Sequence, residues 1–303
     1  MILARDALRG SYPPLITPLR DGAIDEDAFA RLVELQIAHG SHGIVVNGTT
    51  AEPATLTVAE RKRLLEVALD AASGRLPVVA ATGSQSLAET LELTLHADAL
   101  PVEALLIVTP YYTRPPQRGL VAYYRAVAER ITHPFLVYHI PGRTAVSVTV
   151  ETLLEIAEAT PHFVGMKHAV NDLGFVTRAL AALGDDFRIF AGLEELSYPI
   201  LAVGGCGLMN AVANLAPRRI AELYAAAARG DAAGARALHA ALNEINEAVF
   251  FDTNPIPIKY MMRRLGLLER NEHRLPMISA TPELENRLDG VLARAGLLAG
   301  APV

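Results

Sequence analysis

Short apolar runs alternate with longer amphipathic segments along the first 225 residues, and no other feature of the chain restricts its fold as strongly. The apolar runs have the length of buried strands and lie at residues 12–17, 43–47, 77–81, 104–108, 135–138, 163–167, 188–191 and 207–212. Segments with helical periodicity separate them, at residues 26–39, 58–73, 87–97, 119–131, 150–159, 174–183 and 195–203. Strands joined through helices pair in parallel, because the helix crosses over to the next strand. Eight such units predict an α/β fold, a closed (β/α)8 TIM barrel.

The strand pattern stops after Pro217, and only helical patterns follow it. Helices are expected at residues 218–229, 232–251, 257–265 and 282–295, separated by glycine and proline. No tract rich in serine, proline and glycine precedes them, so we expect a helical extension that packs against the barrel and does not move independently. The sequence therefore predicts a barrel with the active site in residues 1–225 and a C-terminal helical region in residues 226–303.

Composition excludes several classes of protein. The only cysteine is Cys206, so the chain has no internal disulfide and suits a reducing cytoplasm. The formal net charge is −6, whereas a nucleic-acid-binding protein would show a basic stripe. Charged residues, glycine and proline interrupt every apolar run before it could span a membrane. The first residues lack a basic flank followed by a long apolar core, so we expect no export signal. Neither a Cys/His metal pattern nor a phosphate-binding loop is present, so we expect no metal and no nucleotide cofactor.

Lysine is rare in this chain, and the only three are Lys62, Lys167 and Lys259. Lys167 follows the apolar run that starts at Phe163, so its side chain is expected at the end of a buried strand. A desolvated lysine can lose its proton and become a nucleophile, whereas arginine stays protonated. A lysine that extends from the strand end to water is an equally good interpretation of this position alone.

In a (β/α)8 barrel the residues just after each strand face the active site, so the residues that follow the predicted strands are the candidates for catalysis and binding. The second strand is followed by Gly48-Thr49-Thr50, whose hydroxyl and N–H groups can bind a carboxylate or phosphate oxygen, or can cap the next helix. The fourth is followed by Tyr111-Tyr112, which point in different directions on an extended chain and are more typical of packing or interfaces than of proton transfer.

The fifth strand ends in Tyr138, and Arg143 follows closely. A buried tyrosine can act as an acid and base, and arginine is the usual bidentate partner of a carboxylate. His139 alternates away from Tyr138 along the strand, which favours a structural role for the imidazole. An amine, phenols, an anion-binding turn and an arginine together suit Schiff-base chemistry on a 2-oxo acid.

Several segments now form a recognisable set, namely Gly48-Thr49-Thr50-x-Glu52, Tyr111-Tyr112, Tyr138-x-x-Pro141-Gly142-Arg143-Thr144, Gly165-Met166-Lys167 and Asn254-Pro255-x-Pro257-x-Lys259. In order and spacing this set resembles the dihydrodipicolinate synthase / N-acetylneuraminate lyase family over essentially the whole chain. The resemblance implies a pyruvate-dependent class I lyase that has no cofactor. It also implies pyruvate and an aldehyde as substrates, and a homotetramer in the cytoplasm.

The resemblance also implies roles in catalysis. Lys167 matches the lysine that forms a Schiff base with pyruvate, and Tyr138 matches the tyrosine that relays protons. Thr49 matches a threonine of the same relay. Tyr112 matches a relay tyrosine that reaches in from a neighbouring subunit, and Tyr111 matches its partner at the interface.

Four further residues match positions that bind the substrates. Thr50 matches the threonine that binds the carboxylate of pyruvate. Arg143 matches the arginine that holds the carboxylate of the second substrate. Gly192 and Met209 fall where the family lines the pocket with a glycine and an aliphatic side chain.

The chain departs from the usual synthase pattern at several positions, all of which are expected beside the substrate pocket. This chain has Ala51-Glu52-Pro53 where synthases commonly have Gly-Glu-Ser, and Gly192-Leu193-Glu194 where they have Gly-Asp-Asp. It also has His139 in place of an asparagine, His168 in place of an acid and Met209 in place of an isoleucine. The nominal reaction is the condensation of pyruvate with aspartate semialdehyde to 4-hydroxy-tetrahydrodipicolinate. The altered pocket leaves open a catabolic aldolase or hydratase-aldolase that acts on another 2-oxo acid, for example a dicarboxylic one. A non-catalytic barrel for sensing or assembly is a third hypothesis, which the retained lysine, tyrosines and threonines disfavour.

Overall fold

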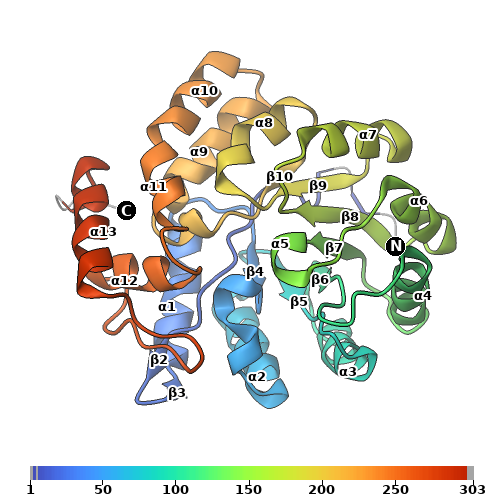
Figure 1. Cartoon of the computed structure of the whole chain (residues 1–303), viewed down its shortest axis with the longest axis horizontal. Helices are drawn as coiled ribbons and strands as arrows, with labels where there is room; N and C mark the ends of the chain where they lie inside the picture. Colours follow the sequence, from blue (N-terminus) through green and yellow to red (C-terminus); the bar gives the residue numbers. More distant parts are fainter. Residues whose placement is uncertain (1–2, 5, 299–303) are drawn as a thin grey trace.

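Eight parallel strands form a barrel at the centre of the computed structural model, which describes residues 3–4 and 6–298 (Figure 1). They are β1 (Gly10–Ser11), β4 (Ile44–Val46), β5 (Val78–Ala81), β6 (Ala104–Val108), β7 (Phe135–His139), β8 (Phe163–His168), β9 (Arg188–Ala191) and β10 (Gly207–Leu208). The order is β1-β10-β9-β8-β7-β6-β5-β4, and a parallel bridge between Pro14 and Val45 joins the two ends. The predicted TIM barrel is confirmed.

The strands are continuous apolar runs because both faces of the sheet are covered. In β7, Leu136 points into the barrel interior, where it packs with Val45, Leu106 and Phe190. Its neighbour Val137 points outward into the larger core between the strands and the helices. Alternation with a period of two therefore assigns each strand residue to the interior or to the helix layer.

Helices surround the barrel, and they are α1 (Glu26–Ala38), α2 (Val58–Ala72), α3 (Leu87–Asp98), α4 (Gln117–Ala128), α6 (Val150–Ala159), α7 (Leu173–Leu183), α8 (Ser197–Ala202) and α9 (Pro217–Ala228). Side-chain caps fix where several of them begin. Before α2, Thr57 accepts a hydrogen bond from the Glu60 N–H while the Glu60 carboxylate accepts one from the Thr57 N–H. This reciprocal capping box satisfies two backbone donors that a helix start otherwise leaves unpaired. Within the described residues, no helix is long and apolar enough to cross a membrane.

The C-terminal region contains α10 (Ala232–Ala241), α11 (Asn243–Ala248), α12 (Ile256–Arg264) and α13 (Pro282–Arg294). In Figure 1, α10 lies beside α8 and α9, whereas α13 packs against α11 and α12. The single helix expected at residues 232–251 is wrong, because it is divided at Leu242. The Leu242 N–H donates to the carbonyls of both Leu238 and His239, which tightens the last turn of α10.

Two predicted strand boundaries are also wrong. Residues 12–17 contain only the Pro14 bridge, because Pro13 and Pro14 have no N–H to donate to a strand ladder. The last strand stops at Leu208, and η4 (Ala211–Asn214) forms a 3₁₀-helix in place of its expected second half.

A hairpin between β2 (Leu19–Arg20) and β3 (Ala23–Ile24) was not predicted. Asp21 and Gly22 at its turn have φ values of 51° and 80°, as a type I′ turn requires.

Candidate active site

A cavity of about 40 Å³ lies at the C-terminal ends of the strands. Seven of the predicted site residues line it, namely Thr49, Thr50, Tyr138, Arg143, Lys167, Gly192 and Met209. A larger cavity of about 730 Å³ shares Thr49, Tyr138, Arg143 and Asn254 with it. The residues chosen from separate strand ends therefore converge on one place.

Lys167 lies on β8 and points into the barrel interior, where only 3% of it is exposed. Its strand partner in register is Tyr138 on β7, and the Lys167 Nζ lies 4.5 Å from the centre of the Tyr138 ring. Gly192 leaves the space for this side chain, because a Cβ atom at that position would lie 2.9 Å from the Lys167 Cε. The amine is thus held on an aromatic face inside a small cavity, out of bulk water.

The phenol of Tyr138 is bonded to a second hydroxyl. Thr49 stands at the start of η1 (Thr49–Ala51), and its Oγ1 donates a hydrogen bond to the Tyr138 Oη at 3.2 Å. Tyr138 is buried, with 5% of its surface exposed. A phenol held next to an amine and bonded to a hydroxyl can pass a proton in either direction.

An arginine also lines the cavity. Arg143 lies in α5 (Pro141–Thr144) and is exposed, and its Nη2 donates to the carbonyl oxygen of Asn254 at 3.1 Å. The Asn254 Nδ2 in turn donates to the Thr50 Oγ1 at 3.1 Å. A guanidinium at the mouth of the cavity is suited to a carboxylate-bearing substrate.

Glu194 is a residue of the site whose function was not predicted. It follows β9, lines the small cavity and is 1% exposed. Its Oε1 accepts hydrogen bonds from the backbone N–H groups of Ala211 at 2.6 Å and Val212 at 3.3 Å, while its Oε2 has no hydrogen-bond partner among the described residues. Burial raises the pKa of this carboxyl to about 7. Inspection of the end of the seventh predicted strand would have indicated Glu194, as it did for the other strand ends.

His139 and His168 were expected beside the substrate pocket, and this expectation is wrong. Neither lines either of the two cavities. They lie outside the barrel wall, where their Nδ1 atoms are 3.4 Å apart and the His168 ring stacks on Phe175 of α7 with centres 5.0 Å apart. Because Tyr138 and Lys167 point inward, the next residue on each strand points outward. The departures beside the described cavities are therefore Pro53, Leu193, Glu194 and Met209.

The two adjacent tyrosines have different environments. Tyr111 lines the larger cavity. Tyr112 lines neither cavity and is 86% exposed. Its backbone φ of 67° changes the direction of the chain after Tyr111. Within one chain Tyr112 therefore does not reach Lys167.

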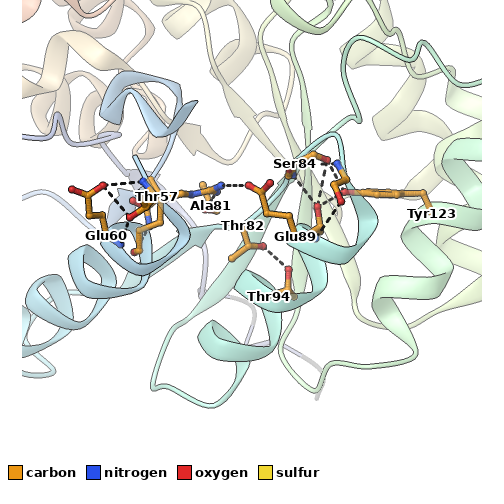
Figure 2. A network of polar contacts seen from close by, with 12 residues as sticks. Thr57, Glu60, Ala81, Thr82, Ser84, Glu89, Thr94 and Tyr123 are labelled. Atoms are coloured by element: carbon orange, nitrogen blue, oxygen red, sulfur yellow. Dashed lines mark hydrogen bonds and ion pairs between the residues drawn. The ribbon is translucent and has the colours of Figure 1, made fainter. Parts of the chain in front are cut away.

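A polar network (Figure 2) includes four residues that line the larger cavity, Thr57, Arg61, Ala81 and Glu89. The buried Arg61 of α2 donates to Glu89 of α3 at 3.2 Å and to the carbonyl oxygen of Ala81 at 3.3 Å. Further along this network, the hydroxyls of Thr90 and Tyr123 lie 2.7 Å apart. The contacts join α2, β5, α3 and α4 beside the larger cavity. No group of His, Cys, Asp and Glu side chains among the described residues could hold a metal ion.

A (β/α)8 barrel with a buried lysine beside a phenol and a hydroxyl defines the class of lyases that work through a Schiff base, the class I aldolase type. The chain belongs to the dihydrodipicolinate synthetase family, whose sequence pattern it matches over residues 7–295.

Relatives and solved structures of this family are similar to the chain along almost its whole length. The 4-hydroxy-tetrahydrodipicolinate synthase of Thermus thermophilus is 45% identical over 291 residues, which cover 96% of this chain and 97% of the relative. The dihydrodipicolinate synthase of Aquifex aeolicus superposes with a TM-score of 0.94 at 36% identity, covering 96% of this chain and 99% of that one. A chloride-inhibited dihydrodipicolinate synthase from Acinetobacter baumannii, solved in complex with pyruvate, gives 0.93 at 33% identity, covering 96% of this chain and 100% of that one.

Proposed function

We propose that the chain is a 4-hydroxy-tetrahydrodipicolinate synthase, which condenses pyruvate with aspartate semialdehyde. The observation that carries the proposal is the convergence of Lys167, Tyr138 and Thr49 on one cavity that Arg143 and Thr50 also line. Relatives across the family bear this name, and the Acinetobacter baumannii structure was solved with pyruvate.

In the first half-reaction the neutral amine of Lys167 attacks C2 of pyruvate, and a C–N bond forms as the carbonyl oxygen takes up a proton. Tyr138 supplies this proton and regains one from the nitrogen, and Thr49 fixes the phenol for both transfers. A second protonation of the oxygen lets water leave, which gives an iminium ion. The Thr50 hydroxyl holds the carboxylate of pyruvate during these steps.

In the second half-reaction the iminium withdraws electrons from C3, which loses a proton to the Tyr138 phenolate left by the dehydration and so forms an enamine. The enamine carbon attacks the aldehyde carbon of the second substrate, the aldehyde oxygen takes a proton from Tyr138, and the iminium forms again. The amino group of aspartate semialdehyde then adds to the iminium carbon and displaces the Lys167 amine, which closes the ring and releases the product. Arg143 holds the carboxylate of this substrate at the mouth of the cavity. Gly192 and Met209 line the same cavity as Lys167, and we assign them to its wall around the substrates.

We propose further that the enzyme is a homotetramer and works in the cytoplasm. The 86% exposure of Tyr112 supports an assembly in which Tyr111 and Tyr112 lie at a subunit interface and Tyr112 completes the proton relay of a neighbour. The free thiol of buried Cys206 suits a reducing compartment. Sedimentation that shows a fully active monomer at the assay concentration would contradict the assembly.

The test of function is turnover. Purified enzyme with pyruvate and aspartate semialdehyde is expected to form the cyclic product at a rate that is proportional to enzyme concentration. A background rate, combined with rapid retroaldol cleavage of a hydroxy-2-oxo acid, would show instead a catabolic aldolase.

A further inference from the structure

Asn254, in the C-terminal region, is bonded to both halves of the site. Its side-chain Nδ2 donates to the hydroxyl oxygen of Thr50 at 3.1 Å, and its backbone carbonyl accepts from the guanidinium of Arg143 at 3.1 Å. Asn254 is 8% exposed and lines both cavities. Its Oδ1 has no hydrogen-bond partner among the described residues.

A buried ion pair fixes the segment that follows Asn254. In α12, five residues further on, the Lys259 Nζ lies 2.9 Å from the Glu52 Oε1, and the Glu52 Oε2 lies 2.8 Å from the His273 Nδ1. Lys259 is fully buried, and the Glu52 and His273 side chains are 3% and 1% exposed. Glu52 comes two residues after Thr50 and closes η1, because its N–H donates to the carbonyl of Thr49. The C-terminal region therefore contacts the segment 49–52 through two residues, Thr50 and Glu52.

The direction of the hydrogen bond at Thr50 has a chemical consequence. A hydroxyl has one proton to donate and accepts through its oxygen. Because the carboxamide N–H occupies an acceptor position of the Thr50 Oγ1, the proton of Thr50 is left to be donated elsewhere. Thr50 lines the cavity that holds Lys167, so an anion placed there can receive that proton.

We propose that Asn254 is a positioning residue, which orients the Thr50 hydroxyl as a donor to the carboxylate of the substrate that reacts with Lys167. The inference rests on the proposed function in one respect, because it takes that substrate to be a 2-oxo carboxylate. Asn254 acts through Thr50 and does not touch the reacting atoms.

The test uses Asn254→Asp, which keeps the shape of the side chain but replaces the donor with an acceptor. The Thr50 proton then points to the new carboxylate and is lost to the substrate. Since a hydrogen bond to a charged group is worth roughly 1.5–3 kcal/mol, the concentration of pyruvate for half-maximal borohydride trapping is expected to rise about 10- to 100-fold. Trapping of pyruvamide, which lacks the carboxylate, is expected to change much less. Asn243→Ala, at an exposed asparagine, is the control.

A double-mutant cycle separates positioning from a general structural role. In a Thr50→Val background, Asn254→Ala is expected to cause little further loss of pyruvate trapping, because its target hydroxyl is already absent. Additive losses, or equal losses for pyruvate and pyruvamide, would overturn the inference while the proposed function stands. If the wild-type enzyme traps no pyruvate, the proposed function and this inference both fail. If Asn254→Ala fails to fold, pyruvate and pyruvamide can still be compared in Asn254→Asp, because that substitution is nearly isosteric.

Discussion

Lys259→Met removes the cation from the buried ion pair that connects α12 to Glu52. The pair has a 2.9 Å separation with both side chains almost completely buried, so the carboxylate loses a partner that water cannot replace. Breaking such a pair from one side costs about 3–5 kcal/mol of unfolding free energy, because an uncompensated charge stays buried. His273 remains bonded to the other carboxylate oxygen in the variant. We therefore expect a loss of unfolding free energy near the lower end of this range, about 3 kcal/mol.

The chain offers a matched control for this experiment. Lys62 forms an ion pair with Glu92 at 2.8 Å, but the two side chains are 27% and 55% exposed. Lys62→Met is therefore expected to cost about 0–1 kcal/mol. Urea denaturation at one fixed protein concentration, followed by circular dichroism, measures both variants, and the second substitution Glu52→Gln should recover part of the loss in Lys259→Met. Equal small losses in the two lysine variants would refute the account of the buried pair.

The same pair predicts a dependence on pH. Burial by itself raises the pKa of the Glu52 carboxyl, but the hydrogen bond from His273 and the charge of Lys259 outweigh burial and hold the pKa below its ordinary value of 4.5. A carboxyl whose pKa is lower in the folded state stabilises the fold above that value and loses its contribution as the pH falls. Lys259→Met should therefore reduce the loss of stability on acidification, which the same urea titrations at acid and neutral pH would detect.

Three further predictions concern the cavity. Lys167→Arg keeps the charge but cannot supply a neutral amine, so kcat is expected to fall by at least about a thousandfold, and substantial residual condensation would show that Lys167 is not the nucleophile. Arg143→Ala is expected to raise the KM of the aldehyde about 10- to 100-fold while pyruvate trapping stays largely intact, whereas equal loss of both would place Arg143 at pyruvate. The Glu194 carboxyl has a higher pKa in the folded protein, so the stability of the wild type should decline as the pH rises from 4.5 to about 7. Urea titrations should show a smaller decline for Glu194→Gln. The same dependence of stability on pH in both proteins would contradict the raised pKa.

The barrel and most of its cavity could be predicted because each depends on a local pattern. A strand of a parallel barrel is an apolar run, and the residue after it faces the site, so Lys167, Tyr138 and Thr49 were found by position and chemistry. Successive side chains of a strand point alternately into the barrel interior and toward the helix layer. The same rule predicts that His139 and His168, each one residue beyond an inward-facing side chain, point outward.

Other features depend on contacts between distant parts of the chain and have no local signal. Asn254 and Lys259 were noticed only as part of a family motif, because their partners Thr50 and Glu52 lie about 200 residues earlier in the sequence. The proline-containing stretch before the first helix resembled a strand in composition, but residues without an N–H cannot complete the ladder.

The central claim is that Lys167 forms a Schiff base with pyruvate, and borohydride reduction followed by peptide mass spectrometry tests it directly. The chain contains only three lysines, so Lys62 and Lys259 serve as internal references for a partly exposed and a buried amine. The account predicts a reduced pyruvate adduct on the peptide that contains Lys167, formed in proportion to pyruvate occupancy and absent from the other two. No adduct, or an adduct confined to Lys62 or Lys259, would contradict it.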